Sequence, residues 1–256
     1  MENSEFQKLV EIMRTLRGKD GCPWDKEQTH SSLRQYLLEE AHEVLEALDD
    51  GNDEELRIEL GDLLLQIVFH AQIASEAGKF AIGDVIRAIN EKLIRRHPHV
   101  FGDKKIQTSE QQTVNWEKIK KLEGKKSVLD GVPRTLSALL RAHRIQHKAA
   151  HVGFDWQKAE DVWKKVEEEM KELTEVVAEK DQSKIESEFG DLLFALVNYS
   201  RFICVNPEDA LGRTIAKFTS RFKYIEAKLR KSGKSIDMAS FEEMDQLWEE
   251  SKKSLP

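Results

Sequence analysis

The fold is decided by the stretch Glu39-Glu40-Ala41-His42-Glu43, which a spacer of fifteen residues separates from Glu59-Leu60-Gly61-Asp62. The pattern returns as Glu168-Glu169-Met170-Lys171-Glu172 and, after another fifteen residues, Glu188-Phe189-Gly190-Asp191. Matching positions are always 129 residues apart. The charges of a solvent-exposed helix face drift, so acids kept twice at one spacing indicate a duplicated unit with shared chemistry.

The composition favours helices throughout. Of 256 residues, 39% are hydrophobic and 34% charged, with only 13 Gly and 5 Pro, a balance typical of helical proteins. The stretch 123–133 contains Gly124, Gly131 and Pro133 and is the expected linker. We therefore predict an all-α fold, a tandem repeat of two helical bundles over residues 1–125 and 126–256.

Apolar residues recur at helical spacing along the chain, and no run of alternating strand residues stands out. In the first copy, helices are expected at about 6–16, 33–48, 54–77, 84–97 and 109–122. In the second, they are expected at about 135–151, 158–179 and 183–205, then one opened by Pro207 and a last one carrying Trp248. Each acidic set thus falls on a hairpin of two helices.

Charge and cysteine content restrict the partners and the location. The net charge of −7 and the lack of a clustered basic face argue against nucleic acid as a partner. The apolar runs are too short to span a membrane, and the polar, acidic start is unlike a signal peptide. Cys22 and Cys204 form no CxxC pair, which is typical of a reducing compartment. A cytoplasmic protein is expected.

The acid spacing predicts a metal site. Residues three or four apart share a helix face, so Glu40 lies beside Glu43, and Glu59 beside Asp62. A hairpin can bring the two pairs together, where the carboxylates would repel one another unless cations neutralise them. Oxygen ligands without Cys or His suit Mg²⁺, or Mn²⁺, which binds substrate phosphates.

At these residues the chain resembles the MazG family of nucleoside triphosphate pyrophosphohydrolases, within the all-α NTP pyrophosphatase superfamily. The EExxE and ExxD pattern matches both copies. Further matching stretches are Gly21-Cys22-Pro23-Trp24-Asp25, 95–101 (Arg-Arg-His-Pro-His-Val-Phe) and 128–133 (Val-Leu-Asp-Gly-Val-Pro). The resemblance covers nearly the whole chain.

The resemblance implies hydrolysis of a nucleoside triphosphate between its α and β phosphates, giving the monophosphate and pyrophosphate, and it implies a homodimer. Glu39 and Glu168 could orient or deprotonate the attacking water. The implied metal ligands are Glu40, Glu43, Glu59 and Asp62 in the first copy and Glu169, Glu172, Glu188 and Asp191 in the second. Such ions would lower the pKa of the water and neutralise phosphate charge.

Basic and aromatic residues repeat in further registers. Lys92 and Arg96 match Lys217 and Arg221, 125 residues on, and Trp116 and Lys120 match Trp248 and Lys252, 132 residues on. The cations are reasonable phosphate contacts, although a solvated basic face is the competing interpretation. The tryptophans could stack on a base, but a Trp on a helix face more often anchors a core.

The copies differ at positions that could bear on substrate binding. Asn198 stands where the first copy has Phe69, and Lys171 where it has His42. A polar side chain two helical turns from Asp191 could contact substrate, so we expect the second copy to be the main catalytic one. Both copies keep full acidic sets.

Other interpretations have less support. Glu39 and His42 form an ExxH of the di-iron kind, but Lys171 breaks it in the second copy. His143, His147 and His151 share one helix face and lack counterparts in the first copy, which favours an ordinary surface. Gly233-Lys234-Ser235 ends like a Walker motif, but Lys228 replaces the first glycine. A non-catalytic scaffold or nucleotide-sensing module would explain the helices but not the paired acids.

Overall fold

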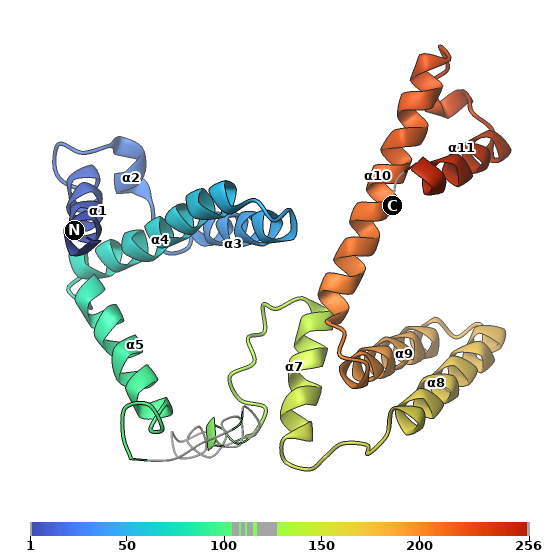
Figure 1. Ribbon diagram of the computed structural model, residues 1–256, viewed down its shortest axis with the longest axis horizontal. Helices are drawn as coiled ribbons and strands as arrows, with labels where there is room; N and C mark the ends of the chain where they lie inside the picture. Colours follow the sequence, from blue (N-terminus) through green and yellow to red (C-terminus); the bar gives the residue numbers. More distant parts are fainter. Residues whose placement is uncertain (1, 104–107, 109–110, 112–114, 117–126, 255–256) are drawn as a thin grey trace. The chain divides into compact units, whose positions relative to one another are not determined.

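The computed structural model describes residues 2–103, 108, 111, 115, 116 and 127–254, and within these residues it contains helices and no strand (Figure 1). The chain divides into two units, residues 1–107 and 108–256, called here the first and second unit. The all-α prediction is confirmed. The predicted limits at 125 and 126 lie outside the described residues and remain a prediction. Every described helix is too short or too polar to cross a membrane.

The first unit is built on a helical hairpin. It contains α1 (Glu2–Leu16), α2 (Pro23–Glu27), α3 (Arg34–Asp49), α4 (Asp53–Glu76) and α5 (Ile82–Arg96). Helices α3 and α4 lie side by side, and α1 packs on α4 (Figure 1). The turn between them needs Gly51, whose φ of +63° is left-handed, and the Asn52 side chain accepts a hydrogen bond from the Glu55 amide, which starts α4.

The second unit repeats this hairpin with longer flanking helices. It contains α7 (Ala138–Ala150), α8 (Ala159–Glu179), α9 (Gln182–Phe202), α10 (Pro207–Lys231), the 3₁₀ turn η1 (Ile236–Met238) and α11 (Phe241–Ser254). Helices α8 and α9 form the hairpin, α7 packs on α9, and α10 packs on α11 and α7. Lys180 takes the left-handed place of Gly51, and the Asp181 side chain caps α9.

Most expected helices occur within a few residues of their predicted limits. Helix α5 begins at Ile82 rather than Asp84, because the Asp84 carboxylate accepts from the Ala81 amide and caps the helix from inside its first turn. The short elements α2 and η1 were not expected. The helix predicted at 109–122 lies mostly outside the described residues, although Trp116 is itself helical.

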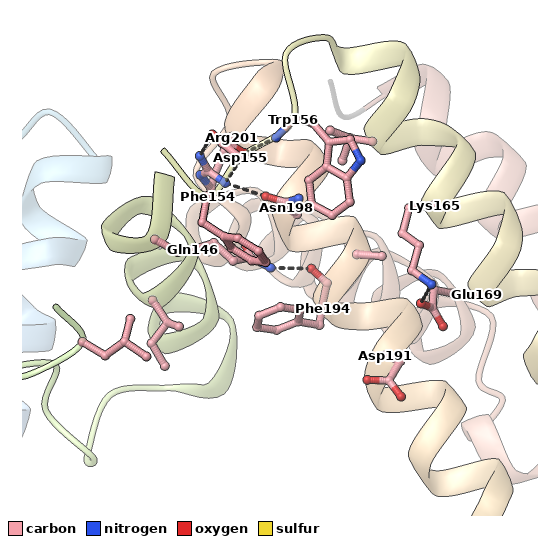
Figure 2. Close-up of a pocket in the computed structure, with 15 residues that line it drawn as sticks. Gln146, Phe154, Asp155, Trp156, Lys165, Glu169, Asp191, Phe194, Asn198 and Arg201 are labelled. Atoms are coloured by element: carbon pink, nitrogen blue, oxygen red, sulfur yellow. Dashed lines mark hydrogen bonds and ion pairs between the residues drawn. The ribbon is translucent and has the colours of Figure 1, made fainter. Parts of the chain in front are cut away.

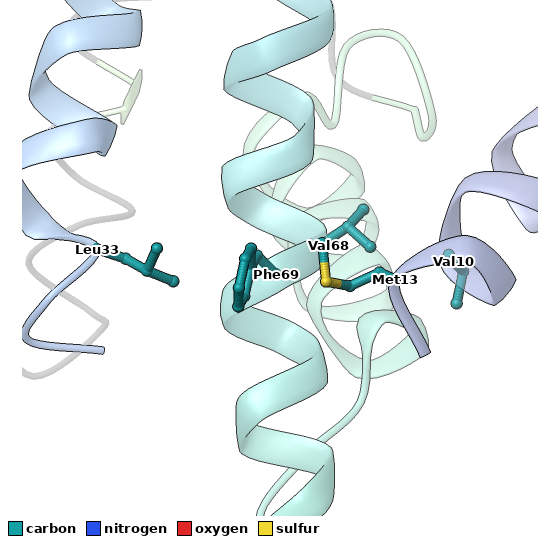
Figure 3. Close-up of a cluster of buried hydrophobic side chains, with 5 residues drawn as sticks. All are labelled: Val10, Met13, Leu33, Val68 and Phe69. Carbon is teal, nitrogen blue, oxygen red and sulfur yellow. The ribbon is translucent and has the colours of Figure 1, made fainter. Parts of the chain in front are cut away.

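The core of the first unit lies between its hairpin and α1. Val10, Met13, Leu33, Val68 and Phe69 form one buried cluster, with Phe69 in the middle of α4 facing the others (Figure 3). Close packing of this kind resists changes in volume. The cluster therefore fixes α4, the helix that carries Glu59 and Asp62.

Candidate metal and substrate site

Each hairpin gathers three carboxylates where the sequence predicts a metal site. In each set, oxygen atoms of the three side chains all lie within 4.8 Å of one another. The sets, called here the acidic triads, are Glu40, Glu43 and Glu59 in the first unit and Glu169, Glu172 and Glu188 in the second. They come from α3 and α4, and from α8 and α9, so the predicted meeting of helix faces occurs in both units.

The triads carry the electrostatic cost of gathered negative charge. Burial, followed by the charges of Asp62 and Glu43, raises the pKa of Glu40. Burial and the Glu43 charge raise the pKa of Glu59, and burial and the Glu169 charge raise that of Glu172. Such shifts mean that the ionised forms repel one another, which a divalent cation would relieve.

The fourth predicted ligand of each set lies next to its triad. The charge of Asp62 acts on both Glu40 and Glu59. Asp191 lines the same cavity as Glu169, with the two side chains on facing helices (Figure 2). The residues fit a hard cation, because each unit offers carboxylate oxygens alone from two helices.

The predicted water-activating residues lie at the edge of the triads. Glu168 accepts a hydrogen bond from Lys165 at 2.8 Å, and Lys165 also pairs with Glu169 at 2.7 Å. These bonds raise the pKa of Lys165. Glu39 is exposed on α3. Lys165 thus supplies one positive charge to the second triad, where the matching position of the first unit is Tyr36.

A cavity of about 440 Å³ opens beside the second triad. It runs from Glu169 and Asp191, at the acid end, to Trp156 at the corner before α8 (Figure 2). Its other lining residues, mostly apolar, are Leu129, Ile145, Gln146, Ala149, Phe154, Asp155, Val162, Lys165, Phe194, Ala195, Asn198 and Arg201. An apolar hollow with a few polar groups is typical of a small-molecule site.

The first unit is filled at the matching positions. Phe69, 3% exposed, stands at the position of Asn198 and packs among Met13 and Leu33, the counterparts of cavity residues Ile145 and Val162. Arg17 stands at the position of Ala149, with its Cζ atom 5.4 Å from the centre of the Phe69 ring. A large ring and a guanidinium thus occupy volume that the second unit leaves open.

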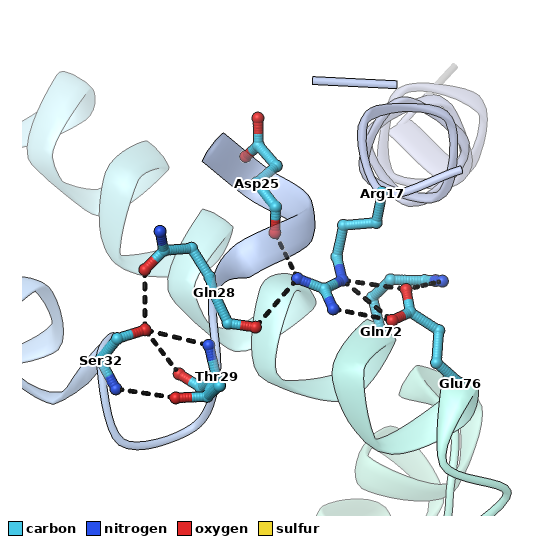
Figure 4. Close-up of polar contacts among 7 residues, drawn as sticks. All are labelled: Arg17, Asp25, Gln28, Thr29, Ser32, Gln72 and Glu76. Carbon is cyan, nitrogen blue, oxygen red and sulfur yellow. Dashed lines mark hydrogen bonds and ion pairs between the residues drawn. The ribbon is translucent and has the colours of Figure 1, made fainter. Parts of the chain in front are cut away.

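Arg17 is held in that place from several sides. Its guanidinium pairs with Glu76 at 2.8 Å, and it donates to the backbone carbonyls of Asp25 and Gln28 (Figure 4). A buried guanidinium with its donors satisfied is costly to move. The filling of the first unit is therefore a stable feature of its packing.

The predicted basic and aromatic residues of the second unit come together on α10 and α11. The Arg221 Cζ atom lies 5.7 Å from the Trp248 ring centre, and Lys252 pairs with Glu249 at 2.5 Å. Lys217 is exposed on α10. Of the nine predicted substrate contacts, Asn198 alone lines the cavity. Lys92, Arg96 and Trp116 are described in the first unit, and Lys120 lies outside the described residues.

The histidines do not form a metal site in the described part of the chain, where groups of three ligands occur only in the two acidic triads. The ring centres of His143 and His147 are 6.4 Å apart, and those of His147 and His151 are 4.3 Å apart. Burial, then nearby positive charges, lowers the pKa values of His143 and His147. His42 joins neither triad, so a di-iron arrangement gains no support.

Several cavity residues were not found from the sequence, among them Gln146, Asp155, Lys165, Phe194 and Arg201. None belongs to the repeated pattern, because the first unit has Gln72 at the position of Arg201 and Tyr36 at that of Lys165. Lys165 could have been found, since it precedes Glu169 by one helical turn.

Comparisons with known proteins agree with this geometry. The model of the MazG nucleotide pyrophosphohydrolase domain matches residues 28–101 and again 157–225, which hold the two hairpins. A Thermotoga maritima protein, "Nucleoside triphosphate pyrophosphohydrolase/pyrophosphatase MazG", is 51% identical over 96% of this chain and 95% of its own length. The Escherichia coli K12 "Nucleoside triphosphate pyrophosphohydrolase" is 42% identical over 98% of both chains. The Bacillus subtilis "Uncharacterized protein YabN" is 50% identical over 98% of this chain and 52% of its own length.

Proposed function

The chain belongs to the MazG nucleotide pyrophosphohydrolase family, and from this we propose how its residues hydrolyse nucleoside triphosphates. The enzyme cleaves the bond between the α and β phosphates, releasing pyrophosphate and the nucleoside monophosphate. The observation that carries the proposal is the acidic triad, whose oxygen atoms lie within 4.8 Å of one another.

We assign divalent cation binding to the acidic triads together with Asp191 and Asp62, with Mg²⁺ as the ion and Mn²⁺ as a substitute. When bound, the ion would lower the pKa of a water molecule and neutralise charge on the phosphates. Glu169, Glu172 and Glu188 would hold it in the second unit, and their mutual repulsion would then become attraction to the ion. Glu168 is assigned to orienting the attacking water.

The phosphate tail needs positive charge from the chain as well. We assign phosphate contacts to Lys217, Arg221 and Lys252, with Trp248 supporting Arg221 through its ring, and assign the corresponding residues Lys92, Arg96, Trp116 and Lys120 to the first unit. Positioning and charge stabilisation supply most of the catalysis of phosphoryl transfer. No covalent nucleophile is required.

We propose that the second unit is the main catalytic one. Its cavity adjoins the triad and leaves room for the nucleoside part of the substrate, whereas Phe69 and Arg17 fill the matching space in the first unit. The first unit retains its triad and so retains a place for a cation.

A homodimer is proposed from an apolar stripe that both units expose. On α4 it consists of Leu60, Leu64 and Ile67, and on α9 of Phe189, Leu193 and Leu196, each residue between 37% and 52% exposed. Within each helix the members are three or four positions apart and share a face. Two such stripes, 129 residues apart, suit pairing of each unit with the same unit of a second copy. Free cysteines at positions 22 and 204 support a cytoplasmic location.

The function is tested by analysing products from a panel of NTPs and dNTPs with Mg²⁺, Mn²⁺ or EDTA. Wild type is expected to release pyrophosphate, and to lose activity in EDTA. Glu172→Gln removes one carboxylate from the second triad and should lower kcat at least about 100-fold, while Glu43→Gln should retain most activity. Glu186→Gln, an exposed glutamate on α9, is the matched control.

Release of inorganic phosphate from wild type, or equal activity of wild type and Glu172→Gln, would contradict the proposed function. Equal losses in Glu172→Gln and Glu43→Gln would contradict only the assignment of catalysis to the second unit.

A further inference from the structure

The cavity of the second unit holds a chain of three polar side chains. The Asp155 carboxylate pairs with the Arg201 guanidinium, Oδ2 to Nη2 at 2.6 Å. The Arg201 Nη1 atom donates to the Asn198 Oδ1 atom at 2.5 Å (Figure 2). All three residues line the cavity, and Asn198 is only 6% exposed. A side chain so buried and so held has one available orientation.

The chemistry of arginine fixes which end of the Asn198 amide faces the cavity. A guanidinium can only donate hydrogen bonds, so the amide atom that meets it must be the oxygen. The Asn198 nitrogen therefore points the other way, towards the Trp156 side of the cavity (Figure 2). Within the described residues no acceptor is recorded for it, and it is not among the solvent-inaccessible atoms that lack a partner. Its two N–H donors face the hollow.

The position of Asn198 suits the base end of a nucleotide. Asn198 lies seven residues after Asp191 on α9, which is about 10 Å along the helix axis. Phosphates held at the acid end would place the nucleoside at this distance, between apolar and aromatic walls that include Trp156 and Phe194. A planar base fits such walls and carries carbonyl or ring-nitrogen acceptors on its edge.

We propose, on the basis of the pyrophosphohydrolase function above, that Asp155 and Arg201 are positioning residues for substrate recognition. They hold the Asn198 amide so that its N–H donors meet an acceptor atom of the nucleobase. The first unit lacks this device, since Phe69 and Gln72 stand at the positions of Asn198 and Arg201. The chain of contacts is thus specific to the unit with the open cavity.

The decisive variant is Asn198→Asp. Aspartate has the same shape and still accepts from Arg201, but it turns an acceptor instead of a donor towards the base. We expect its KM for NTPs to rise about tenfold, with kcat within about twofold of wild type. Arg201→Met should produce the same KM change by releasing the amide, and Arg201→Lys should recover part of it. Lys184→Gln, which breaks an exposed ion pair with Glu179 on the same helix, is the control.

Competition by inorganic tripolyphosphate separates base recognition from phosphate binding. Because this probe has no base, its inhibition constant should be the same for wild type and Asn198→Asp. Circular dichroism of each variant establishes that the helices are retained. A purely structural role for the Asp155–Arg201 pair predicts that Asn198→Asp, which keeps the Arg201 contact, leaves KM unchanged.

Three results would overturn the inference without touching the reaction itself. They are an unchanged KM in Asn198→Asp, an equal loss of affinity for tripolyphosphate and NTPs, and a loss confined to ribonucleotides, which would place the contact on the 2′-hydroxyl. Failure of wild type to release pyrophosphate would instead overturn the proposed function.

Discussion

At the scale of single residues, the first unit contains a histidine pair that limits how many protons it can hold. The Nδ1 atoms of His30 and His70 are 2.8 Å apart, and the two rings stack with centres 5.1 Å apart. One nitrogen must donate and the other accept, so the contact requires that one Nδ1 lack a proton. Burial, then the charge of His30, lowers the pKa of His70.

This pair predicts a loss of stability in mild acid. The pKa of His70 is lower in the folded chain than its ordinary 6.5, so below about pH 6.5 the unfolded chain binds more protons and is favoured. The stability contribution is therefore complete above pH 6.5 and is lost as pH falls through the folded-state pKa. Between about pH 7.5 and 5.5, the urea midpoint of wild type should fall more than that of His70→Gln.

The control for this prediction is His42→Gln, an exposed histidine on α3 of the same unit. Its midpoint should follow wild type across the pH range. Parallel pH profiles for wild type and His70→Gln would show that the pair does not control acid stability.

The residues of the site divide by how local their signal is. Spacing of three or four along a helix was enough to predict the triads, because that geometry is built into every helix. Arg201 and Asp155 are 46 positions apart and meet only because the corner before α8 packs near the end of α9. No periodicity in the sequence carries that information. The predicted roles of Glu39 and Glu168 stay predictions.

At the scale of elements, two capped helices position the second pair of acids in each unit. The Asn52 Oδ1 atom accepts from the Glu55 amide at 3.2 Å, and the Asp181 Oδ1 atom accepts from the Ser183 and Lys184 amides at 3.1 and 3.3 Å. Glu59 and Glu188 follow these caps by seven residues. A frayed first turn would loosen the helix two turns before each ligand.

Removing the second cap should weaken both the fold and the site. Asp181→Ala is expected to lower the free energy of unfolding by about 1 kcal/mol, because two amides lose their acceptor. The measurement is urea unfolding, with Ser183→Ala as the control at an exposed neighbouring position. A change in Asp181→Ala no larger than in Ser183→Ala would show that the cap contributes little.

Long helices were predicted well, and short ones were not. Apolar spacing over several turns defined α3, α4, α8 and α9, whose limits differ from expectation by a few residues at most. Helix α2 has five residues and begins with Pro23, so it is too short for a period to be seen. The arrangement of α10 against α7 and α11 depends on packing between distant segments.

At the scale of the whole molecule, the repeated apolar stripe predicts self-association. Wild type should sediment as a dimer. The double variant Leu64→Lys and Leu193→Lys places a charge in each stripe, and should weaken the dimer at least about 100-fold through lost apolar burial and an unpaired buried charge. Sedimentation equilibrium at several concentrations measures the change.

The matched control adds the same two charges elsewhere on the same helices, at exposed Ser75 and Gln182, as Ser75→Lys and Gln182→Lys. It should sediment like wild type. A double stripe variant with wild-type mass at every concentration would exclude the stripe as the dimer interface.

Duplication was visible in the sequence, but the difference between the units became clear only from packing. The exchange of Phe69 for Asn198 stands out in the aligned copies. Its meaning depends on Arg17, Met13 and Leu33, which close around the ring in the first unit. The sequence alone could not reveal that this volume is open in one unit and filled in the other.

The open hollow of the second unit has a consequence for how the enzyme tolerates heat. A ligand stabilises only the folded part that binds it, by an amount that grows with its concentration. Abundant cellular nucleotides would therefore protect the hollow unit against melting, while the solid unit, with Phe69 already in place, gains nothing from them. One chain would thus contain a unit stabilised by its own packing and a unit stabilised by its metabolite supply.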